Sequence, residues 1–284
     1  MEFSEYLRSS AKKNGSIVCF GFDPVLEKIP LKETNVEKKI SRFFEMIIDK
    51  CEVEKALPAA VKPNYAFFAQ YGFDGLKALK NVISFSKERK IPLILDAKRG
   101  DIGKTAEAYA KEAFEFWGAD ALTVNPYMGS DTLMPYVKYC QEKEKGIFVL
   151  NRTSNPGAAE LQNLEVGGKK LYMIVAEKIC EIGKNANGNV GAVVGATSVK
   201  EFGEISKFYG KHSKPVPLLV PGVGSQGGSA TEIAKVLREN NYDLGIVRIN
   251  SSSGISYAHE AEKTTDFQGA AVRAIGKLNK EIQY

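Results

Sequence analysis

Eight short apolar runs, separated by longer amphipathic stretches, constrain the fold of this 284-residue chain more than any other feature of its sequence. The runs are rich in Val, Ile and Leu. Near-continuous apolarity, in place of strict alternation, is typical of strands covered on both faces, as in a parallel sheet wrapped by helices. The runs begin at Ser16, Ala59, Pro92, Ala121, Gly146, Gly191, Pro217 and Gly245.

The stretches between the runs have the apolar periodicity of helices, with Lys and Glu at the polar positions. We expect helices over residues 36–55, 75–90, 105–116, 132–143, 169–182, 199–209, 230–240 and 268–282. Eight strands, each followed by a helix, predict an α/β fold of the (β/α)8 type, a TIM barrel. We expect one such domain over residues 1–284, with a short N-terminal helix.

A doubly wound open sheet is the competing architecture. It usually carries a glycine-rich turn after its first strand, which holds a dinucleotide. Here the first run ends in GFDP at residues 21–24, which is no such turn. The segment 151–169 is rich in Gly, Asn and Ser and longer than a connection needs to be, so it is either a mobile lid or a surface insertion.

Composition excludes several classes of protein. The 39 basic and 34 acidic residues give a net charge of +5 with no long Lys/Arg block, so we expect no nucleic-acid partner. No apolar run approaches the roughly 18 residues of a membrane span, and the first 13 residues do not resemble a signal peptide. The four cysteines are widely spaced, without a C-x-x-C pair, which favours a reduced, cytoplasmic protein.

Ionisable residues follow four of the apolar runs. Asp23, Lys62, Asp96 and Arg248 each come after a run, at the end where the predicted strand stops. The carboxyl ends of all strands meet at one rim of a parallel barrel, which is where barrel enzymes place their chemistry. A single charge at a strand end is more often a solvated loop residue, but four of them favour a site.

The segment LDAKRGDI, residues 95–102, is the densest in charge. Side chains alternate along a strand, so Asp96 and Lys98 point the same way, and Gly100 lets the chain turn to present Asp101. A carboxylate beside Lys98 in a closed site holds this amine protonated, which suits a proton donor rather than a nucleophile. The alternative is a surface ion pair at the start of a loop.

A glycine-rich loop over residues 221–228, PGVGSQGG, follows the seventh run. Its backbone N–H groups are not crowded by side chains, and Arg248, at the end of the eighth predicted strand, offers a guanidinium suited to two phosphate oxygens. The loops after strands seven and eight form the usual phosphate site of such barrels. These features predict a phosphorylated small-molecule ligand, although the glycines also suit tight turns.

The motifs LDAKRGDIGKTAEAYA, GFDP, VKPNYAFF, TVNPYMG and VPGVGSQGG closely resemble the orotidine 5′-phosphate decarboxylase family, in consistent order from Gly21 to Ser251. DAKRGDI is the form of its longer bacterial branch. The resemblance implies a (β/α)8 barrel that forms a homodimer through its active-site face. It also implies conversion of orotidine 5′-phosphate to uridine 5′-phosphate and CO₂, the last step of pyrimidine nucleotide synthesis, with no metal or organic cofactor.

The resemblance also implies roles for individual residues. Lys62, Asp96, Lys98 and Asp101 match the catalytic array of the family, with Lys98 donating a proton to C6 and Asp101 reaching in from the partner subunit. Asp23 and Thr105 are expected at the ribose, with Thr105 coming from the other subunit. Gln226 and Arg248 are expected at the phosphate, beside the backbone of Gly222 and Gly224. Ser154 is expected at the pyrimidine, and Asn125 is a weaker candidate.

Two rival functions remain open at this point. A related phosphate-sugar decarboxylase shares the D-x-K-x-x-D pattern but resembles a Mg²⁺ enzyme with an acidic residue after its second strand. Lys62 occupies that position here, and its charge would repel a metal. A non-catalytic sensor of phosphorylated ligands is the other rival, and it has no need for charges beyond a phosphate clamp.

Overall fold

The computed structural model describes residues 1–214, 216–224 and 227–284 of the chain. The eight apolar runs form the eight strands of one parallel sheet, ordered β2-β1-β10-β9-β8-β5-β4-β3. Isolated bridges join β2 to β3 and close the barrel. The strands are β1 Val18–Phe22, β2 Ala60–Pro63, β3 Ile94–Arg99, β4 Ala121–Val124, β5 Gly146–Arg152, β8 Val190–Val194, β9 Leu218–Val220 and β10 Val247–Ser251.

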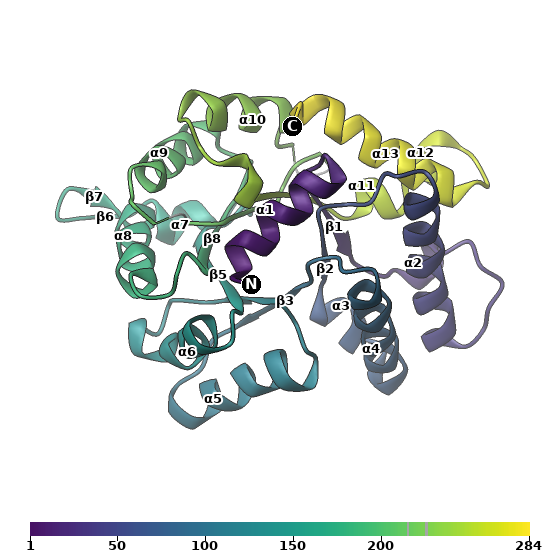
Figure 1. Cartoon of the computed structure of the whole chain (residues 1–284), viewed down its shortest axis with the longest axis horizontal. Coiled ribbons are helices and arrows are strands. Elements are labelled where there is room, and N and C mark those ends of the chain that lie inside the picture. Colours follow the sequence, from purple (N-terminus) through teal and green to yellow (C-terminus); the bar gives the residue numbers. More distant parts are fainter. Residues whose placement is uncertain (215, 225–226) are drawn as a thin grey trace.

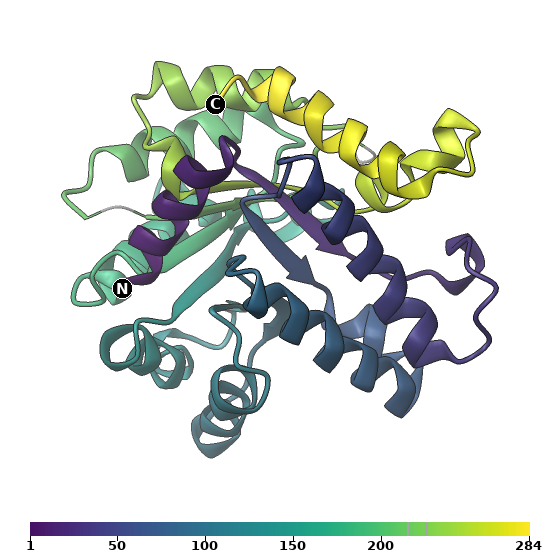
Figure 2. The same ribbon diagram turned by 45° about the vertical axis from the view of Figure 1, so that its right-hand side comes forward.

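Helices surround the barrel, and a helix forms in each of the eight predicted ranges (Figures 1 and 2). The (β/α)8 barrel is therefore confirmed. The surrounding helices are α2 Val36–Val53, α4 Gly72–Glu88, α5 Gly103–Lys111 with the π-helical turn η2 Glu112–Phe116, α6 Met134–Glu142, α8 Leu171–Gly183, α9 Val199–Gly210, α10 Ala230–Glu239 and α13 Phe267–Ile282.

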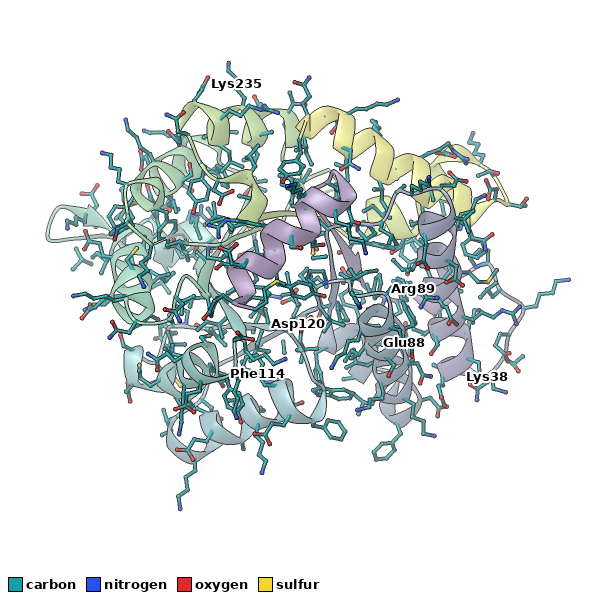
Figure 3. The ribbon with its side chains drawn as sticks, in the orientation of Figure 1. Lys38, Glu88, Arg89, Phe114, Asp120 and Lys235 are labelled. Carbon is teal, nitrogen blue, oxygen red and sulfur yellow. The ribbon has the colours of Figure 1, made fainter. Side chains whose placement is uncertain are left out.

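Several of these helices begin at a residue whose side chain caps the first turn. A short polar side chain in this position accepts a hydrogen bond from a backbone N–H that has no partner within the helix. Exposed polar residues then cover the outer helix faces, as Lys38, Glu88 and Lys235 do in Figure 3. The capping residues are Asn35 for α2, Ser198 for α9, Ser229 for α10 and Asp266 for α13.

The N-terminal helix α1, Phe3–Asn14, lies across the amino end of the barrel (Figure 1). Its Phe3 and Leu7 are buried in the barrel interior, and Phe3 packs edge-on against Phe148 of β5 with ring centroids 5.9 Å apart. This apolar layer closes the end of the barrel opposite to the predicted site. A second, larger apolar core lies between the sheet and the outer helices.

The structure adds short elements that the apolar periodicity did not predict. Most lie on connections after strands, where a few residues suffice for one turn. None of the helices in the described ranges is long and apolar enough to cross a membrane. The additional elements are α3 Tyr65–Ala69, α7 Ala158–Gln162, α11 Ser253–Ser256, α12 Ala258–Glu262, the hairpin of β6 Glu165–Val166 with β7 Lys169–Lys170, and the 3-10 turns η1 Leu26–Lys28, η3 Ser130–Thr132 and η4 Leu244–Ile246.

Candidate active site

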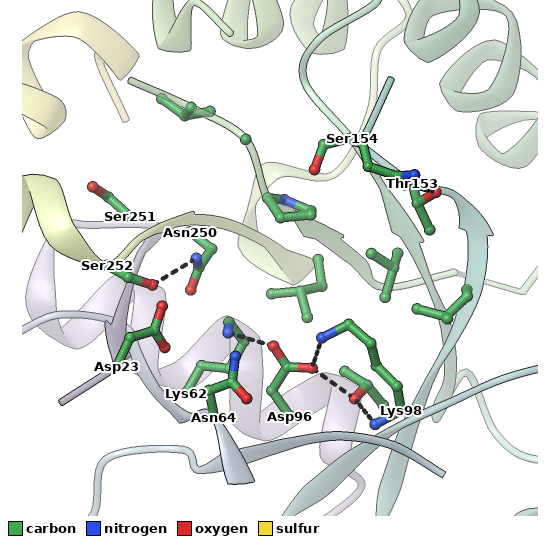
Figure 4. A pocket seen from close by; sticks show the side chains of 18 of the residues that line it. Asp23, Lys62, Asn64, Asp96, Lys98, Thr153, Ser154, Asn250, Ser251 and Ser252 are labelled. Carbon is green, nitrogen blue, oxygen red and sulfur yellow. Dashed lines mark hydrogen bonds and ion pairs between the residues drawn. The ribbon is translucent and has the colours of Figure 1, made fainter. Parts of the chain in front are cut away.

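A cavity of about 420 Å³ opens at the carboxyl ends of the barrel strands. Asp23 follows β1, Lys62 is the last residue but one of β2, Asp96 and Lys98 lie on β3, and Ser252 follows β10. All five side chains line this cavity (Figure 4). Segments more than two hundred residues apart in the sequence therefore meet in one place. The expectation that charges at strand ends converge on one rim is met by Asp23, Lys62 and Asp96.

A buried ion cluster forms one wall of the cavity. Asp96 accepts a hydrogen bond at Oδ2 from Lys62 Nζ at 2.7 Å and another at Oδ1 from Lys98 Nζ at 2.6 Å. The side chains of Lys62 and Asp96 are only 5% and 9% exposed, whereas that of Lys98 is 51% exposed. Lys62 is thus enclosed with its partner, while Lys98 reaches into the cavity, where a ligand can contact it.

The electrostatics of the cluster keep Lys62 and Asp96 charged near neutral pH. Burial by itself would raise the pKa of Asp96, but Lys62 and Lys98 outweigh this effect and hold that pKa well below its usual range. Burial would likewise lower the pKa of Lys62, but the nearby carboxylates of Asp96 and Asp23 raise it above its usual value. The cavity therefore presents fixed charges in a place with little water.

Polar groups without partners face the cavity beside Asp23. Asp23 Oδ1 and Asn250 Oδ1 are buried and accept no hydrogen bond from the described residues. Asn250 Nδ2 donates to Ser252 Oγ at 3.5 Å. A side chain at Gly21 would come within 1.9 Å of that oxygen, so glycine lets β1 and the turn after β10 approach each other. Unpaired buried acceptors are suited to hydroxyl groups of a ligand.

The opposite wall is formed by the loop after β5, where Thr153 and Ser154 lie (Figure 4). Gln162 of α7 fixes this loop, because its Oε1 accepts from the Thr153 amide at 2.9 Å and its Nε2 donates to Thr153 Oγ1 at 2.8 Å. Ser154, expected from the resemblance, thus lines the cavity. Arg152, the residue from which the loop starts, is also held in place, because its Nε donates a hydrogen bond to Glu201 at 2.8 Å.

Five of the predicted residues that the structure describes do not line this cavity within one chain, and Asp101, Thr105 and Asn125 are three of them. Asp101 and Thr105 are on the segment that runs from β3 into α5, and Thr105 is exposed. The Asp101 carboxylate accepts from the amide of Ile102 at 2.8 Å. Asn125 Oδ1 accepts from the Tyr127 amide at 3.0 Å, so Asn125 stabilises a local turn and is not brought into the cavity.

Part of the predicted phosphate loop reaches the cavity. Gly222, with a φ of 90°, lines it beside Pro221 and Val223. Gly224 does not, and its N–H already donates to the carbonyl of Gly228 at 3.0 Å, so the expected role of its backbone is not supported. Gln226 lies outside the described residues.

The assignment of Arg248 to the phosphate clamp is wrong. Arg248 is the second residue of β10 and not its last, and it is fully buried at the amino end of the barrel. Its guanidinium donates to the carbonyls of Gly245 at 3.1 Å and Val247 at 2.7 Å, and also to that of Leu7 in α1. Burial lowers the pKa of Arg248 to about 10. Its guanidinium satisfies backbone carbonyls at the closed end of the barrel and does not reach the cavity.

Other lining residues were not singled out from the sequence. Each polar one lies near or just beyond a strand end, in VKPN, TVN, RTSN or INSSS, and this position was the available signal. In the described part of the chain no three His, Cys, Asp or Glu side chains are grouped so as to hold a metal ion. The further polar lining residues are Asn64, Thr123, Thr153, Asn155, Asn250, Ser251, Ser252 and Ser253.

A parallel barrel whose carboxyl rim holds a cavity-facing Lys-Asp-Lys cluster, built on a buried Lys-Asp pair, has the architecture of a barrel enzyme. The family model described as orotidine 5'-phosphate decarboxylase / HUMPS family matches residues 36–266. The chain therefore belongs to this family, and it is an enzyme of the carboxy-lyase class.

Individual relatives agree with this membership. An orotidine 5'-phosphate decarboxylase of Cupriavidus taiwanensis is 43% identical, over 95% of this chain and 94% of the relative. The structure of Leishmania donovani OMP decarboxylase is 34% identical with a TM-score of 0.78, and each chain is covered completely. The Leishmania donovani UMP synthase structure is 36% identical with a TM-score of 0.80, over 99% of this chain and 57% of that longer one.

Proposed function

We propose that this protein converts orotidine 5′-phosphate to uridine 5′-phosphate and CO₂ without a metal or organic cofactor, and that Lys98 protonates C6. Family membership supports the decarboxylation step of pyrimidine biosynthesis. The observation that carries the proposal is the ion cluster, in which the half-exposed Lys98 ammonium is held 2.6 Å from the buried Asp96 carboxylate.

The proposed reaction breaks the bond between C6 and the carboxylate and leaves the electron pair on C6. This pair lies in the ring plane and cannot delocalise into the π system, so the site must stabilise it electrostatically. The Lys98 ammonium provides a fixed positive charge and the proton that forms the new C–H bond. Asp96 repels the substrate carboxylate before CO₂ leaves, and Lys98 recovers its proton from water.

The remaining walls of the cavity suit the other parts of the substrate. The unpaired acceptors of Asp23 and Asn250 match the ribose hydroxyls. We assign the pyrimidine ring to the side of Ser154. The phosphate then lies against Gly222 and the hydroxyl groups of residues 251–253, at the usual phosphate end of such barrels. Its binding energy can favour closure of the site and thereby raise the rate of the chemical step.

Two rival functions are weaker on these observations. A Mg²⁺-dependent decarboxylase would require an acidic residue where Lys62 stands, and Lys62 instead donates to Asp96. A sensor of phosphorylated ligands would gain nothing from burying Lys62 and Asp96, because desolvated charges are costly unless a function needs them.

We further propose that the active form is a homodimer in the cytoplasm, in which Asp101 and Thr105 complete the partner's cavity. Both residues lie outside the cavity of their own chain. Two apolar side chains close to them along the rim, Ile102 and Tyr127, are 61% and 80% exposed, and a second copy would cover them. All four cysteines are free thiols, which supports a reducing compartment.

The first prediction tests the activity directly. Purified protein should release CO₂ from orotidine 5′-phosphate in the presence of EDTA. Lys98→Ala should lower turnover by at least about 10²-fold, the effect typical of a lost proton donor, while uridine 5′-phosphate still binds. Lys235→Ala on the outer face of α10 is the matched control and should retain full turnover. Activity that disappears with EDTA, or a Lys98→Ala protein with more than about a tenth of wild-type turnover, contradicts the proposal.

A further inference from the structure

Strand β3 departs from regular pairing where it carries the acid and the proton donor. Leu95 pairs with Leu122 and Arg99 with Val124, so residues 96–98 of β3 lie opposite Thr123 of β4 alone. Lys98 has a φ of 47°, in the left-handed region that residues other than glycine rarely adopt. Bulges of this kind often lie beside active sites, where they redirect a side chain.

Thr123 compensates for the ladder hydrogen bonds that the bulge removes. Its Oγ1 accepts a hydrogen bond from the Lys98 backbone N–H at 2.9 Å and donates one to Asp96 Oδ1 at 3.0 Å. Thr123 is only 1% exposed, so water does not readily replace this hydroxyl. One side chain therefore holds both the backbone of the proton donor and the carboxylate paired with it.

We propose that Thr123 is a positioning residue, whose hydroxyl sets the relative placement of Asp96 and Lys98 for proton transfer. This inference rests on the proposed function. Within the described part of the chain, Asp96 Oδ1 is otherwise held only by Lys98 Nζ, and Oδ2 by Lys62 Nζ. When Lys98 gives up its proton, its attraction for Asp96 weakens, and Thr123 still fixes Oδ1.

The role requires a hydroxyl and not merely a side chain of this size. Valine has nearly the shape of threonine but can neither accept from the Lys98 amide nor donate to Asp96. The bulge would then contain an N–H without a protein partner, and the backbone of Lys98 would relax. Serine keeps the hydroxyl and loses only a methyl group.

The test compares Thr123→Val with Thr123→Ser in steady-state decarboxylation of orotidine 5′-phosphate. Thr123→Val should lower kcat by about 10²-fold and change KM less than about threefold, because contacts to ribose and phosphate are untouched. Thr123→Ser should stay within about threefold of wild-type kcat. Ser86→Ala, which removes a buried hydroxyl bonded to Val82 O in α4, is the matched control and should leave both constants unchanged.

Turnover is expressed per site that binds uridine 5′-phosphate, counted by titration, so a partly unfolded variant still gives a valid kcat. If Thr123→Val keeps more than about a third of wild-type kcat, the hydroxyl is dispensable and the inference is overturned. Equal losses in the valine and serine variants would also overturn it, because packing by the methyl group would then explain both. An inactive wild-type protein would contradict the proposed function instead.

Discussion

The two lysines that pair with Asp96 differ in how far solvent reaches them, and this difference separates their roles. Lys62 is enclosed, so its charge balances the buried carboxylate and holds it in place. Lys98 is half exposed and borders the cavity. A buried carboxylate is stable as an anion only when paired, so the cluster depends on both contacts.

Replacing the central carboxylate tests this dependence. Asp96→Asn leaves Lys62 buried without a counterion and should lower the free energy of unfolding at pH 7 by roughly 3–5 kcal/mol. The folded-state pKa of Asp96 lies below its unfolded value of about 3.9, so its contribution is complete above that pH and is lost as pH falls through the folded pKa.

Urea unfolding at pH 7 and pH 3 measures this prediction. The difference in stability between wild type and Asp96→Asn should narrow by about 1 kcal/mol at pH 3, where the unfolded carboxyl is mostly protonated. A difference that is equal at both pH values would mean that the charge of Asp96 does not stabilise the fold.

Arg248 illustrates how a residue suited to phosphate can serve the fold instead. Arg248→Ala removes the donor for three buried backbone carbonyls and should lower the free energy of unfolding by about 3–5 kcal/mol. The KM for orotidine 5′-phosphate should stay at the wild-type value in the folded fraction. A raised KM for this substrate, without a similar loss of affinity for unphosphorylated orotidine, would show that Arg248 does bind the phosphate.

At the scale of elements, the segment 151–169 combines two parts with different connections. Residues 153–155 line the cavity, and Gln162 of α7 holds Thr153 in place. The β6–β7 hairpin follows α7. The amide of Leu171 donates to Leu164 O at 2.8 Å, so a backbone hydrogen bond joins the residues on either side of the hairpin. Residues 153–155 therefore belong to the wall of the cavity, whereas the hairpin lines no part of it and is arranged as a surface insertion.

Changes to the two parts should therefore have separate effects. Gln162→Ala frees Thr153 and should raise KM about three- to tenfold, because two neutral hydrogen bonds that order the loop are lost. Replacing residues 165–170 by a short Gly-Ser turn should leave both KM and the melting temperature near wild type. Kinetics and thermal unfolding check both variants. A large KM increase on loss of the hairpin would identify it as a lid.

At the scale of the whole molecule, the barrel leaves Asp101 outside its own cavity, and the proposed dimer explains this placement. A two-fold interface would pair Lys98 of each subunit with Asp101 of the other, so a mixed dimer of Lys98→Ala and Asp101→Ala subunits would contain one intact site. Each variant alone should be inactive, and mixing should restore activity.

The expected recovery follows from symmetry. Equal amounts with free exchange make half of the dimers mixed, with one intact site in each, so activity should approach roughly a quarter of wild type. Subunit exchange is verified separately with differently tagged chains. If exchange occurs and activity stays absent, Asp101 acts in its own subunit or has another role.

The sequence alone determined the architecture and the centre of the site. The eight apolar runs and the amphipathic stretches between them report burial locally, so strands and helices formed where the periodicity placed them. The pattern D-x-K also predicted that Asp96 and Lys98 meet, although a bulge at residues 96–98, and not regular alternation, places Lys98 beside Asp96. Lys62 joined them because parallel strands end at a common rim.

The tertiary structure decided the features that depend on distant segments. An apolar run does not show at which of its residues the strand begins. The run GIVRINSS therefore did not reveal that Arg248 lies near the amino end of β10, or that Asn250 lies at the cavity. The carbonyl of Leu7 that Arg248 contacts is 241 residues away in sequence. The bulge opposite Thr123 arises from pairing between two strands. Such contacts form only when the barrel closes, and no local pattern encodes them.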